Sequence, residues 1–371
     1  MKKNISKGFY VVKNWISYLT GIMLPVPVGY VIIGVTYLCS AKCKMCQIYD
    51  FYKRNPELRK EELDSTFIFK RLKESHLIKK IKHIDLTGGE PFLKEDLKKL
   101  IINIFTLPNI GLVTINTNAL LPEKIISDTE AILKTLGKNK FFSISISIDG
   151  AGKIHDEIRG VEGAFSRVEQ TVDGLKTLRE KYPSFLIRSN TVMQPQNIDC
   201  LAEIKNYWNK HNIKGAFSLL QAPFYTHSES VVETNMKFSS KDIEKIKLAH
   251  PKSVGMNYYL DNNFKRPLHC FAGYSSIFID PLGKVFPCNF LAGNDEYVMG
   301  NIKESSIDSL WAARTAANVR KKIKSCSYVS CWNGCEVDQT MLQFEFLNRV
   351  IKLLSLGFFN YYKLRGLKGF K

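Results

Sequence analysis

The stretch Val35–Asp50, VTYLCSAKCKMCQIYD, places three cysteines within eight residues, at Cys39, Cys43 and Cys46. It overlaps the end of an apolar run, Tyr30–Leu38, whose composition is typical of a β-strand. Thiolates are the usual protein ligands of iron-sulfur clusters, and a cubane of four irons needs one ligand for each iron. Three cysteines therefore leave one iron open to a small chelating molecule, as a catalytic zinc ion leaves a position open to substrate.

Two other metal sites are compatible with three cysteines taken alone. A histidine elsewhere in the chain could complete a zinc site, and a distant cysteine could complete a two-iron cluster. However, His83, His155 and His269 have no metal-like spacing to another histidine, and we expect structural or surface roles for them. The spacing C-x3-C-x2-C on a loop after the first strand favours the open four-iron cluster.

The fold class follows from an alternation of two patterns along the chain. Strand-like runs recur at Tyr30–Leu38, Ile81–Thr87, Leu112–Thr117, Phe142–Ile148, Phe185–Val192 and Ala216–Leu220. Amphipathic segments lie between them, at Glu61–Lys79, Leu93–Phe105, Pro122–Leu136, Ala164–Lys181 and Asn197–Lys210. This alternation predicts an α/β fold of parallel strands joined by crossover helices, either an open doubly wound sheet or a barrel or part-barrel.

A polar cluster follows each of the first four strands directly. The cysteines follow the first, TGGEP the second, TNA the third and DG the fourth. In β/α barrels the chemistry gathers at the carboxyl ends of the strands, so we expect these loops to converge on one mouth. The fourth strand, FSISISIDG, places serines on one face and isoleucines on the other, which suits a polar lumen and a face packed under helices.

The chain has nine cysteines, of which five lie toward the C-terminus at positions 270, 288, 326, 331 and 335. Cys200 stands alone on a helical stretch, where we expect a buried, small apolar side chain. Clustering at short spacing, without a recognisable secretory signal, favours metal binding over disulfides and the cytoplasm as the compartment. The stretch Ser275–Cys288 is typical of a hairpin that turns at Pro281–Gly283 and brings Cys288 back toward Cys270.

Lys and Arg exceed Asp and Glu by 18 in this chain of 371 residues. This excess implies a positive field, but it is spread along the chain, and we expect no nucleic-acid partner. Lys13, Pro25 and Pro27 interrupt the apolar start, and no apolar segment approaches the ~20 residues that a spanning helix needs. The last stretch, 344–371, mixes aromatic and basic residues; it could pack on the barrel or make peripheral contact with a membrane.

The loop CSAKCKMC resembles the cluster-binding loop of the radical S-adenosylmethionine (SAM) enzymes, C-x3-C-x-aromatic-C, with Met45 at the aromatic position. GGEP resembles the family motif that binds the methionine amino group, and Ser147–Phe165 resembles the fourth-strand region of the family. The resemblance implies that Cys39, Cys43 and Cys46 hold a 4Fe-4S cluster whose open iron binds SAM. It further implies cofactor contacts at Gly88, Gly89, Glu90, Ser147, Asp149 and Arg159, with Asn118, Asn190 and Thr191 as weaker candidates.

Ordinary structural roles remain open for two of these residues, because Asp149 could cap the next turn and Arg159 could pair with Asp156. Toward the C-terminus, the spacing C-x12-G-x4-C resembles the hallmark of the auxiliary-cluster domains called SPASM and twitch. A full SPASM domain has seven cysteines for two clusters. Five cysteines imply one auxiliary 4Fe-4S cluster, held by Cys270, Cys288 and members of the set Cys326, Cys331 and Cys335; a structural zinc site is the alternative.

The resemblance implies a partial (β/α)6 barrel over residues 28–225 and an auxiliary-cluster domain over 226–343, between an N-terminal extension, 1–27, and the tail 344–371. The implied reaction is reductive cleavage of SAM to a 5′-deoxyadenosyl radical that abstracts a substrate hydrogen. A reductase, ferredoxin or flavodoxin would supply the electron. Peptide or protein modification is the first hypothesis, and dehydrogenation or epimerisation of a carbohydrate or lipid-linked molecule is the second. A non-catalytic iron-sulfur or zinc protein that binds a partner is the third.

Overall fold

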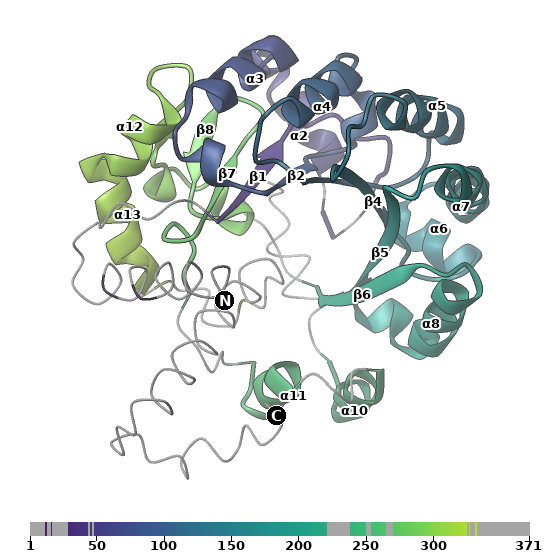
Figure 1. Ribbon diagram of the computed structural model, residues 1–371. Coiled ribbons are helices and arrows are strands. Elements are labelled where there is room, and N and C mark those ends of the chain that lie inside the picture. Colours follow the sequence, from purple (N-terminus) through teal and green to yellow (C-terminus); the bar gives the residue numbers. More distant parts are fainter. Residues whose placement is uncertain are drawn as a thin grey trace, which may run out of the picture.

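The computed structural model describes residues 12, 16, 29–43, 45–46, 48–220, 238–249, 254–264, 270–324, 326 and 331. Within these residues, nine strands form one sheet in the order β6-β5-β4-β3-β2-β1-β7-β8-β9. The strands are β1 Tyr30–Gly34, β2 His83–Thr87, β3 Leu112–Thr117, β4 Phe141–Ser147, β5 Phe185–Met193, β6 Lys214–Leu219, β7 Ser276–Ile279, β8 Lys284–Phe286 and β9 Gly300–Asn301. The sheet curves without closing, as Figure 1 shows, so the predicted partial barrel is confirmed.

Helices cover the outer side of the curved sheet (Figure 1). The α-helices are α2 Phe51–Arg54, α3 Ser65–Glu74, α4 Leu97–Phe105, α5 Pro122–Leu133, α6 Lys153–Arg159, α7 Ala164–Lys181, α8 Leu201–Lys210, α10 Ser240–Ala249, α11 Val254–Asp261, α12 Ile307–Ala312 and α13 Arg314–Lys324. Short 3-10 helices are η1 Ile48–Asp50, η2 Pro56–Glu61, η3 Ile78–Lys80, η4 Pro91–Leu93, η5 Pro195–Cys200, η7 Asn289–Leu291 and η8 Asp295–Tyr297. The predicted alternation of strand and helix is therefore present over the first six strands.

The strands β1 to β6 are parallel to their neighbours, and their side chains alternate between helices and lumen. On β4 the isoleucines at 144 and 146 are fully buried, while Ser147 is half-buried. The covering helices present apolar residues at helical spacing, such as Val168, Val172 and Leu175 on α7, all fully buried. The predicted division of β4 into a serine face and an isoleucine face agrees with this burial.

Hydrogen bonds explain why the first predicted strand ends early and why the predicted helix over Glu61–Lys79 is shorter than expected. The predicted helix over Glu61–Lys79 is shorter, because the Asp64 side chain accepts a hydrogen bond from the Phe67 N–H at 2.8 Å and caps α3 there. The predicted first strand reaches only to Gly34, because the backbone of the following residues pairs with the loop after β2 instead of extending the sheet. A local side-chain cap decides the first bound, and a backbone contact between two distant loops decides the second.

The C-terminal strands continue the N-terminal sheet. Strand β7 pairs in parallel with β1, with Tyr30 opposite Ser276 and Ile33 opposite Ile279. Strands β7 and β8 form the predicted antiparallel hairpin, which turns with Gly283 at a φ of 91°. The predicted domain boundary near residue 225 lies outside the described residues and stays a prediction.

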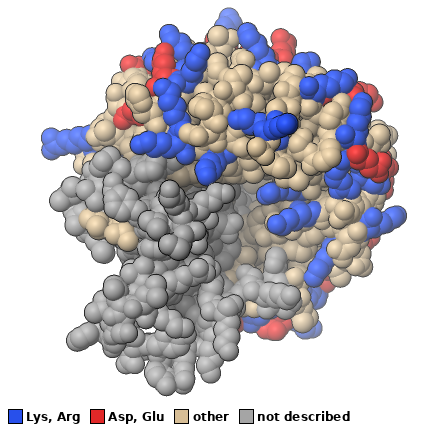
Figure 2. All heavy atoms as spheres, in the orientation of Figure 1, with Lys and Arg blue, Asp and Glu red and all other residues tan. Residues whose placement is uncertain are grey.

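The surface seen in Figure 2 carries Lys and Arg side chains scattered among Asp and Glu rather than gathered in one patch. Within the described part of the chain, no helix is long and apolar enough to cross a membrane. The tail 344–371 and the extension 1–27, apart from Val12 and Ile16, lie outside the described residues. The predicted membrane contact, which depends on those segments, stays a prediction.

Candidate functional site

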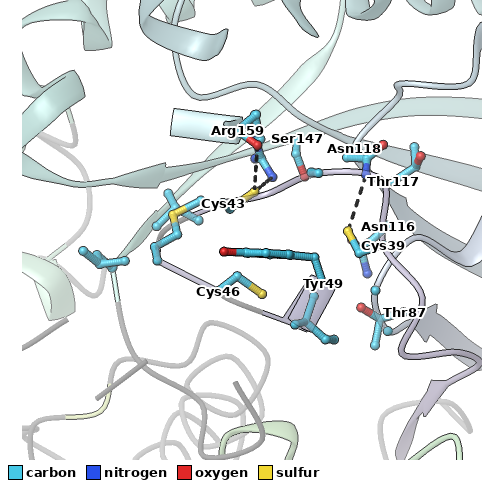
Figure 3. Close-up of a pocket in the computed structure, with 17 residues that line it drawn as sticks. Cys39, Cys43, Cys46, Tyr49, Thr87, Asn116, Thr117, Asn118, Ser147 and Arg159 are labelled. Carbon is cyan, nitrogen blue, oxygen red and sulfur yellow. Dashed lines mark hydrogen bonds between the residues drawn. The ribbon is translucent and has the colours of Figure 1, made fainter. Parts of the chain in front are cut away.

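A cavity of about 230 Å³ opens where the carboxyl ends of the strands meet (Figure 3). Its wall comes from the cysteine loop, the loop after β2, the ends of β3, β4 and β5, helix α6 and the residue after β6. The lining residues are Cys39, Ala41, Cys43, Met45, Cys46, Ile48, Tyr49, Thr87, Gly88, Gly89, Asn116, Thr117, Asn118, Ser147, Arg159, Val192 and Leu220. The prediction that the polar loops converge on one mouth is confirmed for the loops after the first three strands, whereas the DG pair after the fourth strand does not line the cavity.

Two glycines allow the loop after β2 to lie directly against the cysteine loop. The Gly89 N–H donates to the Thr36 carbonyl at 2.8 Å, and the Glu90 N–H donates to the Leu38 carbonyl at 2.6 Å. A Cβ atom on Gly88 would lie 2.3 Å from the Thr36 oxygen, and one on Gly89 would lie 2.0 Å from the Leu38 oxygen. Gly88 also has a φ of 134°. Only glycine fits these positions.

Glu90 is fully buried behind the cavity wall. Its carboxylate accepts hydrogen bonds from the Thr117 hydroxyl at 2.8 Å, the Asn118 N–H at 2.7 Å and the Phe92 N–H at 3.1 Å. Burial raises the pKa of Glu90 to about 7, although these donors favour the ionised form. In this arrangement Glu90 fastens the loop after β2 to the end of β3. Its predicted contact with SAM stays a prediction.

Asn118 contributes a hydrogen-bond donor to the first cysteine. Its side-chain N–H group donates to the Cys39 sulfur at 3.7 Å and to the Ser40 hydroxyl at 3.2 Å. The side-chain oxygen accepts from the Leu120 N–H at 3.0 Å, which fixes the amide in this orientation. The sequence indicated Asn118 only weakly, yet it lines the cavity beside Cys39.

Arg159 contributes a cation to the second cysteine. Its Nη1 atom donates to the Cys43 sulfur at 3.8 Å, and the Lys42 N–H donates to the Arg159 carbonyl at 2.8 Å. The guanidinium forms a buried ion pair with Asp149. The alternative pairing with Asp156 is wrong, because that carboxylate accepts from backbone N–H groups at the start of α7.

Asp149 lies behind the cavity wall and is fully buried. Its side chain accepts from the Val192 N–H at 2.8 Å, and its own N–H donates to Nδ1 of His155 at 3.1 Å. Asp149 therefore joins the end of β4 to β5 and orients Arg159, while Ser147 on the same strand lines the cavity. The predicted contacts of Ser147 and Asp149 with SAM stay predictions.

The three thiols lie in surroundings that disfavour a bare thiolate. Burial raises the pKa of Cys39 and of Cys46 to about 12, and it raises the pKa of Cys43 despite the neighbouring Arg159. Iron would have to displace these protons, so cluster assembly should release them. Three soft sulfur ligands, with N–H donors from Asn118 and Arg159 directed at two of them, fit an iron-sulfur cluster.

The described part of the chain brings no three His, Cys, Asp or Glu side chains close enough together to hold a single metal ion. In Figure 3 the labelled cysteines lie at separate points around the cavity, with the Tyr49 ring directed among them. Sequence reasoning missed Tyr49, Thr87 and Asn116. A period of two along β3 links Asn116 to Asn118 and could have indicated it.

Asn190 and Thr191, the weaker candidates on β5, do not line the cavity. The Asn190 side-chain oxygen accepts from the Ser218 hydroxyl at 2.6 Å, and the Thr191 hydroxyl donates to the Ile148 carbonyl. The apolar side chain of Val192 forms the wall there instead. The predicted SAM contact of Asn190 stays a prediction.

Side chains of β1, β2 and β3 form a polar network in the lumen of the partial barrel. Asp85 on β2 accepts from the Tyr30 hydroxyl at 2.7 Å and from the Asn116 amide at 3.0 Å. Burial raises the pKa of Asp85 to about 7, and nearby Arg188 acts in the opposite direction. Because Asn116 also lines the cavity, this network reaches the site.

His83, His155 and Cys200 have the structural roles that the sequence analysis expected of them. His83 contacts the Thr114 hydroxyl at 2.9 Å, and burial lowers the pKa of His83 to about 4. His155 is fully buried beside Asp149, and Cys200 is buried in the apolar core. His269 lies outside the described residues.

The C-terminal cysteines lie on three segments that surround the β7–β8 hairpin. Cys270 precedes β7, Cys288 follows β8 and is the N-cap residue of η7, and Cys326 follows α13. Cys288 and Cys326 are buried, and Cys331 is half-buried. Cys335 lies outside the described residues. Their assignment as ligands of an auxiliary cluster stays a prediction.

Sequence profiles of two families match the chain. The radical SAM superfamily profile matches residues 33–207, and the SPASM iron-sulfur cluster-binding domain matches residues 270–336. The antilisterial bacteriocin subtilosin biosynthesis protein AlbA of Bacillus subtilis (strain 168) is 24% identical over 294 residues, an alignment covering 75% of this chain and 58% of AlbA. The AdoMet-dependent heme synthase of Methanosarcina barkeri (strain Fusaro / DSM 804) is 25% identical over 284 residues, covering 67% of this chain and 76% of the synthase.

Among solved structures, Streptococcus suis SuiB bound to S-adenosylmethionine has a TM-score of 0.57 at 17% identity, covering 83% of this chain and 69% of SuiB. A curved sheet of mostly parallel strands, with a cysteine-lined cavity at the carboxyl ends of those strands, defines an α/β partial-barrel protein. The chain belongs to the radical SAM superfamily and carries a SPASM-type C-terminal domain. This membership implies 4Fe-4S clusters and S-adenosylmethionine as its cofactors.

Proposed function

We propose that this chain is a radical SAM enzyme whose reaction begins in the cavity lined by Cys39, Cys43 and Cys46. When bound there, the cluster and SAM supply a 5′-deoxyadenosyl radical that abstracts a hydrogen from the substrate. The protein binds and orients these groups and excludes water from them. The proposal rests above all on the three thiols that line one cavity together with the close-packed glycines of the GGEP loop.

Each side of the cavity has a distinct part in this proposal. The three cysteines would hold the cluster, and Gly88 and Gly89 would allow the methionine end of SAM to approach the backbone. Ser147, Asn116 and Tyr49 would contact the remainder of SAM or the substrate, because they line the same cavity. Glu90 and Asp149 would act from behind the wall by holding loops and Arg159 in position.

The test is an anaerobic reconstitution of the full chain with iron and sulfide, followed by an assay for 5′-deoxyadenosine release from SAM under strong reductant. We expect release from the wild type and none from a Cys39/Cys43/Cys46 triple alanine variant. The iron content should fall from about eight to about four per chain in that variant if two cubane clusters are present. Absence of release from a fully iron-loaded wild type would contradict the proposal and favour a non-catalytic iron-sulfur protein.

For the substrate, we propose a peptide. The supporting comparisons are the bacteriocin biosynthesis protein AlbA and SuiB, whose structure was also solved bound to its precursor peptide SuiA. The test uses a small peptide encoded beside the gene for this chain, incubated with the reconstituted enzyme. Loss of two hydrogens, or a change in a residue's configuration, should appear in the peptide by mass spectrometry or chiral analysis, and only in the presence of SAM.

The second candidate is oxidative modification of a small molecule, such as a carbohydrate or lipid-linked substrate. The specific observation in its favour is the AdoMet-dependent heme synthase, which the chain matches over 76% of the synthase's length. A small-molecule substrate would be consumed without any peptide. A screen of SAM-dependent deoxyadenosine release, with peptides and small molecules supplied separately, distinguishes the two candidates.

We also propose a reductase, ferredoxin or flavodoxin as the electron donor. We further propose a cytoplasmic location and peripheral membrane contact through the basic tail 344–371. The tail's six Lys and Arg residues among aromatic side chains support the membrane contact. Sedimentation with anionic vesicles should retain the full chain and lose a variant lacking the tail. Equal binding by both forms would contradict the membrane contact without affecting the proposed reaction.

A further inference from the structure

Arg320 is a buried cation whose hydrogen bonds go to neutral groups. It lies on α13 and is 2% exposed. Its Nε atom donates to the Gly273 carbonyl at 2.6 Å, and Nη2 donates to the Trp311 carbonyl at 2.9 Å. The guanidinium carbon lies 4.2 Å from the centre of the Trp311 ring. The third nitrogen, Nη1, is buried without a hydrogen-bond partner among the described residues.

A cation in such surroundings requires an explanation, because burying a charge without an opposite charge is unfavourable. Burial lowers the pKa of Arg320 to about 10, which still leaves the guanidinium charged at neutral pH. The ion pairs of the described residues include no partner for Arg320, in contrast to Arg159, which pairs with Asp149. An anion that is not a described side chain therefore belongs near Arg320.

The segments that carry three C-terminal cysteines meet at Arg320. Gly273 lies three residues after Cys270, and its carbonyl is bound by Arg320. A Cβ atom on Gly273 would lie 3.0 Å from Cβ of Pro287, the residue before Cys288, and 3.7 Å from Cγ of Arg320. Helix α13 itself ends at Lys324, two residues before Cys326. The unpaired cation therefore lies at the junction of these three segments.

We propose that Arg320 is the counter-cation of the auxiliary iron-sulfur cluster and raises the reduction potential of that cluster. The inference rests on the proposed role of Cys270, Cys288 and Cys326 as cluster ligands. Four thiolates around a four-iron cubane give a net charge of about −2 in the oxidised state and about −3 after one-electron reduction. A fixed positive charge stabilises the more negative state more strongly, so it favours reduction.

A raised potential would suit the auxiliary cluster to accept an electron during the reaction. An auxiliary cluster that accepts the electron of a substrate radical must have a sufficiently high potential, and a proton must leave the substrate as the electron is transferred. Arg320 would raise the reduction potential of the auxiliary cluster without touching the substrate. It would be a positioning and tuning residue rather than a catalytic one.

The test measures the potential of the auxiliary cluster in the full chain with Cys39, Cys43 and Cys46 replaced by alanine, so that a single cluster is observed. Redox titration followed by electron paramagnetic resonance compares the parent with Arg320→Gln, Arg320→Lys and Lys321→Gln. Lys321 is the matched control, because it is an exposed cation on the same helix. We expect R320Q to lower the equilibrium constant for reduction at least tenfold, which is about 59 mV for a one-electron couple. R320K and K321Q should keep the parent potential.

An unchanged potential in an iron-loaded R320Q variant would overturn the inference, as expected if Arg320 pairs with a protein carboxylate instead. If R320Q fails to hold iron, R320K decides: retained iron and potential support a role for the charge, and their loss overturns it. The parent iron content tests the underlying assignment separately. A parent that holds no iron refutes the auxiliary cluster itself, whereas an iron-loaded parent with an unshifted R320Q refutes only the role of Arg320.

Discussion

At the scale of single residues, two side chains from other parts of the chain set the surroundings of the cysteine loop. Asn118 comes from the end of β3, and Arg159 comes from the end of α6; each directs an N–H group at a thiol. The sequence offered two roles for Arg159, a contact with SAM or a pairing with Asp156. It did not indicate the observed pairing with Asp149, because that pairing depends on how α6 packs over the end of β4.

The buried pair Arg159–Asp149 gives the first prediction at this scale. Replacing Arg159 by methionine removes the cation beside Cys43 and leaves a fully buried carboxylate without its partner. Breaking a buried ion pair in this way typically lowers the free energy of unfolding by about 3–5 kcal/mol. We expect R159M to show such a loss in urea denaturation, and the added substitution Asp149→Asn to restore part of it. Equal stability of R159M and the wild type would show that the pair is not formed.

Asp85 gives a prediction of pH dependence. Burial raises its pKa from 3.8 to about 7, so the folded chain retains a proton that the unfolded chain releases. Stability therefore falls as the pH rises through the folded pKa. For a pKa of about 7, the free energy of unfolding should fall by about 1.4 kcal/mol between pH 6 and pH 8.

The substitution Asp85→Asn removes this contribution and preserves the shape of the side chain. Denaturation of the wild type and of D85N at pH 6 and at pH 8 isolates it, because contributions from other groups, such as His83, cancel in the difference. If the free energy of unfolding changed equally between pH 6 and pH 8 in the wild type and in D85N, the raised pKa of Asp85 would be contradicted.

At the scale of elements, the sequence predicted the six strands of the barrel and their order of alternation with helices, since burial imposes strong periodicities on these segments. It did not predict where the cysteine loop begins. Residues 35–38 continue the apolar run, yet they pair with the loop after β2 through the carbonyls of Thr36 and Leu38. A backbone contact between two loops leaves no periodic pattern, and only the adjacent glycines indicated a close approach.

The contact between these loops predicts that replacing a glycine by alanine is harmful at Gly89 and harmless at Gly137. Gly89→Ala would place a Cβ atom 2.0 Å from the Leu38 carbonyl oxygen, so one of the two loops must move. We expect G89A to lose most of the iron bound by the first cluster and most of its deoxyadenosine release. Gly137→Ala is the matched control, because a Cβ atom there has no neighbour within 4 Å. Similar iron content in both variants would show that the loops do not approach this closely.

At the scale of the whole molecule, the C-terminal segment is joined to the barrel by more than a linker. Strand β7 extends the barrel sheet beside β1. The hairpin turn also contacts two segments of the barrel: the Tyr37 hydroxyl, at the start of the cysteine loop, donates to Asp280 at 3.1 Å, and the Leu63 N–H, just before α3, donates to the Pro281 carbonyl at 2.9 Å. The sequence predicted the hairpin but not the pairing of its first strand with β1. Pairing between strands more than 240 residues apart in the chain has no local signature.

The hydrogen bond between Tyr37 and Asp280 tests this coupling. Both side chains are buried, and the other oxygen of Asp280 accepts from the N–H groups of Leu282 and Lys284. Tyr37→Phe should therefore lower the free energy of unfolding by about 1–2 kcal/mol, because a buried acceptor loses its donor while the turn stays intact. Denaturation of Y37F, D280A and the double variant forms a cycle in which we expect a coupling energy of at least about 0.5 kcal/mol. If the two effects are additive, the hydrogen bond between Tyr37 and Asp280 does not couple the cysteine loop to the C-terminal hairpin.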